Sequence, residues 1–161
     1  MAPQTVFFTG LPYNHHTLPG WGWPPERVKS GLENAVGILL KEGYDAIGYF
    51  IAPEQGIKVF EDKLLEQHWD AVIIGWGVRG NPELTPWLED MVNCIHEKAL
   101  KTKIMFNWNP ESTIDTVRRN IPVRDESDIV AMRAVFEKSG IEGRITFGKY
   151  DMPEENGSKN A

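Results

Sequence analysis

The chain has 161 residues, of which 41% are hydrophobic and 25% charged, proportions typical of a soluble globular protein with one domain. Its formal net charge of −6 argues against nucleic acid and anionic membrane surfaces as partners, and no apolar run approaches the ~20 residues that span a bilayer. Because residues 1–4 carry no signal-peptide pattern, a cytoplasmic location is expected. The single cysteine, Cys94, excludes an intrachain disulfide, and its place in a helical pattern favours a buried thiol over a nucleophile.

The chain begins with an apolar, β-branched and aromatic segment, Thr5 to Thr9, which predicts a buried strand ending at Gly10. Residues 11–24, LPYNHHTLPGWGWP, follow it. A strand-to-helix connection usually needs only ~2–6 residues, and longer loops are usually functional. A helix is then expected from the two prolines 24–25 to about residue 40, because apolar residues recur there every three and four positions.

A second strand is predicted over 44–51, and a helix over 54–67. Ala71 to Ile74 form a continuous apolar run without polar alternation, which is typical of a central strand covered on both faces. The segment that follows, GWGVRG, is interpreted as a loop. The remaining pattern predicts helices over 82–99, 110–119 and 128–138, a fourth strand over 103–107, a very short fifth strand over 121–123, and a further strand over 144–147, at an edge of the sheet.

Strands that alternate with helices predict an α/β protein with a parallel sheet covered on both faces. The favoured fold is a three-layer α/β/α, flavodoxin-like, doubly wound and mainly parallel sheet of about five strands in the order 2-1-3-4-5. A one-sided or mixed sheet is the alternative. Residues 1–150 are expected to form a single domain, and the polar residues 151–161 a mobile C-terminal tail.

In the favoured order, strands one and three are neighbours, so the loops that follow them meet at the crevice where such folds bind ligands. His15 and His16 lie in the first of these loops, and Arg79 lies in the second. An imidazole can take or give a proton near neutral pH, and a guanidinium suits a carboxylate, phosphate or enolate oxygen. We therefore predict these three residues as catalytic, with only one of the two adjacent histidines acting. Solvated histidines and a surface ion pair for Arg79 are the alternatives.

Other side chains near the same strand ends are predicted to bind the substrate. Rings in loops are typical of ligand clefts, and an amide at a strand end can hold a ligand oxygen. Glu54 is interpreted either as a first-turn carboxylate that complements a helix dipole or as a base. Asn109 is expected to cap a helix. The predicted substrate-binding residues are Tyr13, Asn14, Trp21, Trp23, Glu54, Trp76, Asn107 and Trp108.

Neither a cofactor nor a metal is expected, because the chain has no GxxxxGK[ST] phosphate loop and no HxxxH, HExxH or CxxC spacing. In length, acidity and strand-helix alternation the chain resembles flavodoxins, a resemblance that implies flavin mononucleotide between aromatic rings. The segment at the flavodoxin phosphate loop is GLPYNHHTLPGWGW, which is longer and contains few serine and threonine residues. Response-regulator receivers are similar in topology, but Gly10 and residues 75–76 replace the acidic residues that phosphotransfer needs.

The preferred hypothesis is a cofactor-independent enzyme that moves protons on a small anionic or aromatic metabolite, by dehydration, isomerisation, decarboxylation or cyclisation. A non-catalytic binding or regulatory module is the second hypothesis, and a flavin mononucleotide protein is the third. A homodimer is a modest expectation, because doubly wound domains often pair through an edge strand or a helix face.

Overall fold

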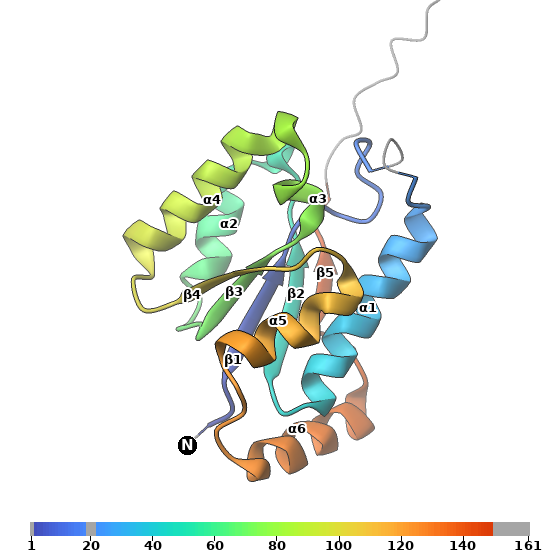
Figure 1. Cartoon of the computed structure of the whole chain (residues 1–161), viewed down its shortest axis with the longest axis vertical. Coiled ribbons are helices and arrows are strands. Elements are labelled where there is room, and N and C mark those ends of the chain that lie inside the picture. The colour runs from blue at the N-terminus through green and yellow to red at the C-terminus, as the bar shows by residue number, and fades with distance from the viewer. Residues whose placement is uncertain (1, 19–21, 150–161) are drawn as a thin grey trace, which may run out of the picture.

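The computed structural model describes residues 2–18 and 22–149 (Figure 1). Five parallel strands form one sheet in the order β4-β3-β1-β2-β5. The strands are β1 (Thr5–Thr9), β2 (Asp45–Phe50), β3 (Ala71–Ile74), β4 (Lys103–Phe106) and β5 (Ile145–Phe147). The helices are α1 (Pro25–Lys41), α2 (Ile57–Leu64), α3 (Trp76–Arg79), α4 (Thr85–Lys98), α5 (Thr113–Asn120) and α6 (Glu126–Ser139).

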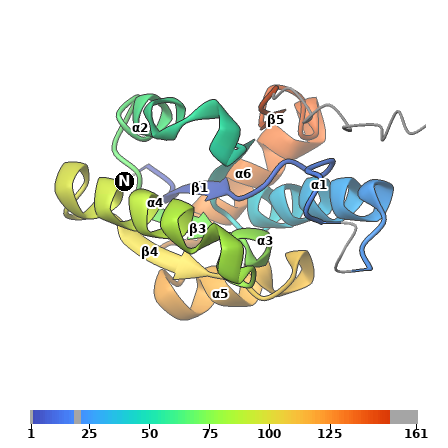
Figure 2. The same ribbon diagram turned by 90° about the horizontal axis from the view of Figure 1, so that it is seen from above.

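Helices cover both faces of the sheet, which gives three layers (Figure 2). Helices α2 and α4 pack together on one face, whereas α1 contacts both α5 and α6 on the other. The central strand β1 supplies side chains to both layers because successive residues of a strand point to opposite faces. Phe7 contacts Phe60 of α2, and Phe8 meets the ring of Phe50 edge-on. The predicted flavodoxin-like α/β fold is confirmed.

The predicted position of the fifth strand is wrong. The order 2-1-3-4 is correct, but residues 121–123 form no strand, and the last strand pairs with β2 at the opposite edge. Two long-range contacts account for this route. The hydroxyl of Tyr44 donates a hydrogen bond to the carbonyl of Ile121 and holds that segment at the start of β2. Arg144 forms an ion pair with Asp45, the first residue of β2.

Three helices begin later than expected, each after a short 3₁₀ turn that opens with proline. These turns are Pro53–Gln55, Pro82–Leu84 and Pro110–Ser112. Proline suits a first turn because its missing N–H would have no partner there. A further correction concerns the segment after β3, which is a helical turn, α3, and not a loop. None of the helices in the described ranges is long and apolar enough to cross a membrane.

The buried hydroxyl of Tyr44 provides a test of this architecture. The Tyr44 side chain is fully buried and its hydroxyl lies 2.8 Å from the carbonyl oxygen of Ile121. Tyr44→Phe leaves that acceptor without its donor, so we expect a loss of about 1–3 kcal/mol in the free energy of unfolding. Urea denaturation measures it. Tyr49→Phe, at a half-buried position of β2, is the control, and equal stability of the two variants would contradict the assignment.

Candidate functional site

The carboxyl ends of all five strands lie at one edge of the sheet, at the top of Figure 1, because the strands are parallel. The long segment after β1, the 3₁₀ turn after β2, helix α3 after β3 and residues 107–109 after β4 therefore all emerge at this edge. This is the edge where parallel sheets bind ligands. Most of the predicted site residues lie here, in two separate groups.

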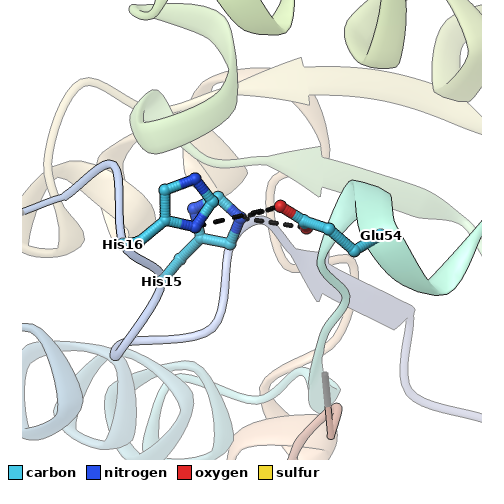
Figure 3. A group of neighbouring side chains, drawn as sticks. All are labelled: His15, His16 and Glu54. Atoms are coloured by element: carbon cyan, nitrogen blue, oxygen red, sulfur yellow. Dashed lines mark hydrogen bonds and ion pairs between the residues drawn. The ribbon is translucent and has the colours of Figure 1, made fainter. Parts of the chain in front are cut away.

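The first group consists of His15, His16 and Glu54, which we call the His-Glu cluster (Figure 3). The Nε2 atom of His15 lies 3.0 Å from each carboxylate oxygen of Glu54. The Nδ1 atom of His16 lies 3.9 Å from Oε1 of the same carboxylate, and the centroids of the two imidazoles are 4.3 Å apart. One carboxylate thus faces two adjacent imidazoles that come from a different loop.

Local turns hold both sides of the His-Glu cluster. The N–H of His15 donates to the carbonyl of Pro12, and its carbonyl accepts from the N–H of Leu18, so residues 12–18 form consecutive tight turns. On the other side, Pro53 opens the turn that carries Glu54, and the side chain of Gln55 accepts a hydrogen bond from the N–H of Ala52. Both loops are therefore held at the sheet before any ligand binds.

The three side chains differ in their access to solvent. His15 is 1% exposed, whereas His16 and Glu54 are 39% and 36% exposed. The Nδ1 atom of His15 lies 2.8 Å from the hydroxyl of Thr17 and accepts from the N–H of that residue, which leaves Nε2–H to donate to Glu54. Burial lowers the pKa of His15 below its usual value, although the neighbouring carboxylate acts in the opposite direction. His15 is therefore a neutral donor that holds Glu54, and His16 and Glu54 are the members that a ligand can reach.

The second group connects α3 to the end of β4. The guanidinium of Arg79 donates to the carbonyl of Asn107 over 3.1 Å and stacks 4.7 Å from the ring of Trp76. The Asn107 side chain is 2% exposed; its oxygen accepts from the N–H of Trp76, and its amide donates to the Thr113 hydroxyl. Asn107 is therefore an anchor between elements, and Arg79 is exposed at the rim. Cooperation between Arg79 and the histidines stays a prediction.

A small cavity of about 40 Å³ is lined by residues of β1 and α1 and of the segments that follow β1, β3 and β4. Three predicted substrate-binding residues line it: Trp23, Trp76 and Asn107. The rest of its wall is mostly apolar, with Leu18 and Leu32 among the lining residues. Of the residues that the structure describes, the lining does not include His15, His16 or Arg79. The cavity can therefore hold a small apolar part of a ligand.

The remaining predicted residues have different surroundings. Tyr13 packs edge-on against Phe147, and Asn14 is exposed in the turn before the histidines. Trp108 is 52% exposed and lies beyond the end of β4. Trp21 lies outside the described residues, as do 151–161, the predicted tail. Asn109 caps the turn before α5, as expected, by accepting from the N–H of Ser112.

The segment after β3 contains a spacing that the expectation of no cofactor wrongly took to be absent. Residues 75–80, GWGVRG, follow a buried strand and have the spacing GxGxxG of dinucleotide-binding turns. Such turns need a long helix whose first turn faces the pyrophosphate. Here the segment is itself the four-residue helix α3.

Packing explains two of these glycines. A Cβ on Gly80 would lie 2.2 Å from the ring of Trp76, and one on Gly77 would lie 3.2 Å from the side chain of Leu18. Both positions are therefore filled by neighbouring side chains of the same edge. Within residues 75–80, the spacing therefore has a packing role.

Comparisons with protein-family models, curated proteins and solved structures found no match. The fold and the site together define an all-parallel α/β protein with a His-Glu cluster at the carboxyl edge of its sheet. Within the described part of the chain, this cluster is also the group whose ligand atoms lie close enough together for one metal ion, all within 4.8 Å of one another.

Proposed function

We propose that this protein is an enzyme that moves protons on a small anionic or aromatic metabolite, without a cofactor. The reaction is of the kind found in dehydration, isomerisation, decarboxylation or cyclisation. The observation that supports it is the Glu54 carboxylate, which faces both a buried imidazole and an exposed one. Carboxylates and imidazoles are common general acids and bases, and catalysis requires that they are held at the reacting atoms.

The geometry suggests a separate role for each member of the cluster. His15 is buried and uses both ring nitrogens, one on Thr17 and one on Glu54, so it acts as a positioning residue. Glu54 is oriented by that contact and is partly exposed, which suits a base that removes a proton from carbon or oxygen. His16 lies beside it and is open to solvent, which suits the return of a proton to a second atom.

Arg79 remains our candidate for stabilising negative charge on a substrate oxygen. A guanidinium has five N–H donors, and the contact with Asn107 takes one of them. Its position over the ring of Trp76, 4.7 Å from the centroid, holds it at the rim of the same edge. Developing negative charge on oxygen is stabilised most when such donors are oriented before the reaction. Trp23 and Trp76 would then contact the apolar part of the substrate.

A non-catalytic binding or regulatory module is the second candidate. The observation that favours it is the 52% exposure of Trp108, which follows Asn107, the residue whose carbonyl accepts from the exposed Arg79. Tryptophan and arginine are enriched among the residues that contribute most to protein interfaces. A module of this kind would bind a partner without altering a small molecule.

The decisive experiment follows proton exchange directly. The protein is incubated in D₂O with a panel of small carboxylic and aromatic acids, and NMR detects loss of C–H signals. For a metabolite that exchanges, His16→Ala is expected to reduce the rate about 10²-fold or more. His96→Ala, at an exposed position of α4, is the control and should retain the rate. Unchanged exchange in His16→Ala, or no exchange with any class of acid, would contradict the proposal.

A further inference from the structure

The His-Glu cluster has the dimensions of a metal site as well as those of a proton-transfer pair. Two ligand atoms that lie about 2.1 Å from a tetrahedral ion are about 3.4 Å apart. The His15–Glu54 distance of 3.0 Å and the His16–Glu54 distance of 3.9 Å lie on either side of that value. All three ligand atoms lie within 4.8 Å of one another, so rotation of the two exposed side chains can bring them to one ion.

The donor atoms indicate the class of ion. Two imidazole nitrogens and one carboxylate are the set found at catalytic zinc sites, where three protein ligands leave a further position open. Calcium and magnesium prefer sites made of oxygen atoms, so they fit this cluster poorly. The exposed fractions of His16 and Glu54 let an ion enter from solvent, while the buried His15 is already oriented.

Thr17 supplies the outer contact that metal-binding histidines usually have. Its hydroxyl lies 2.8 Å from Nδ1 of His15. When Nε2 of His15 binds an ion, the ring proton moves from Nε2 to Nδ1. The Thr17 hydroxyl then changes from donor to acceptor, and the N–H of Thr17 loses its 3.4 Å contact with Nδ1. This change moves one proton within the His15 ring, so Nε2 gains the lone pair that an ion needs.

We propose that His15, His16 and Glu54 bind one divalent transition-metal ion of the zinc class, and that this ion blocks proton transfer by occupying the atoms that carry the proton. The binding of the ion depends only on the geometry of the cluster. Its inhibitory effect rests on the function proposed above, and the two parts are measured separately.

Binding is tested by calorimetric titration of ZnCl₂ into the full-length protein after metal removal with EDTA. We expect one ion per chain. His16→Ala and Glu54→Gln should each weaken the affinity about 10-fold or more, and Thr17→Val, which keeps all three ligands, about 10-fold. His96→Ala is the control. Two results would overturn the site: no binding at micromolar zinc, or an affinity that is unchanged in both His16→Ala and Glu54→Gln. His16→Ala is the specific test, because His16 takes no part in the His15–Glu54 contact between the two loops.

Inhibition is tested with the exchange assay in D₂O. Stoichiometric zinc should stop exchange, and EDTA should restore it. If zinc binds at the cluster but exchange continues at full rate, the inhibitory part is wrong and the metal site stands. If zinc binds and no metabolite exchanges even in EDTA, the proposed function fails and the binding result is unaffected. If exchange instead requires zinc, both the inhibitory part and the cofactor-independent function are wrong.

Discussion

Glu54→Gln is expected to slow the proposed proton transfer by about 10²–10⁴-fold, the usual contribution of a positioned acid or base. Glutamine has the same size and retains an oxygen that can accept the hydrogen bond from Nε2 of His15, 3.0 Å away. The turn that carries residue 54 therefore keeps its contact with the histidine loop. What is lost is the ability to take a proton, so the rate constant should fall while the apparent substrate affinity changes little.

The comparison with a second Pro-Glu turn makes this test specific. Glu83 follows Pro82 at the same edge of the sheet, on an exposed 3₁₀ turn, just as Glu54 follows Pro53. Glu83→Gln makes the same chemical change at a carboxylate away from the cluster and should retain the full rate. Thermal unfolding of both variants checks that the fold is intact. Full activity in Glu54→Gln, or equal losses in both variants, would refute the assigned role of the carboxylate.

Phe7→Ala is expected to lower the free energy of unfolding by about 3–5 kcal/mol, the cost of removing a large ring from a packed core. Phe7 is fully buried in the central strand β1. Its ring centroid lies 5.7 Å from that of Phe60 and 5.4 Å from that of Trp69, so truncation leaves a space between two other rings. Rigid neighbours on the sheet cannot close that space, and the loss includes both burial and cavity terms.

Urea denaturation at equilibrium measures this effect. Val130→Ala, at a residue that is 72% exposed on α6, is the control and should change stability by less than about 0.5 kcal/mol. A loss below about 1.5 kcal/mol in Phe7→Ala would show that the core between β1 and α2 rearranges around the missing ring. The slope of the transition should be the same in both variants if only stability has changed.

The sequence predicted the elements whose signals are local. Apolar periodicity of about 3.6 residues indicated α1 and α4, and the unbroken apolar run at 71–74 indicated the central strand β3. The last strand was harder to place, because three residues carry too little pattern to choose an edge. Its pairing with β2 depends on the packing of α6 against α1 and on contacts such as that of Arg144 with Asp45.

The candidate site was only partly predicted, because its loop has a local signal but its side-chain contacts join distant parts of the chain. The length of the segment after β1 indicated a functional loop that carries His15 and His16, and both lie at the expected edge. Glu54 was included only as a turn carboxylate or base, because its contact with His15 spans 39 positions of the chain. The role of Thr17 was missed, since a lone threonine in a loop has no distinguishing pattern.

The amino-acid order by itself determined that strands alternate with helices and that the loops after the first four strands emerge at one edge, because hydrophobic periodicity and parallel connections act through neighbouring residues. Only the tertiary structure decided which side chains meet there. The two imidazoles contact a carboxylate from the loop after β2, whereas Arg79 donates to Asn107. Such partners depend on where two loops lie relative to each other to within the length of a hydrogen bond, and no local pattern encodes that distance.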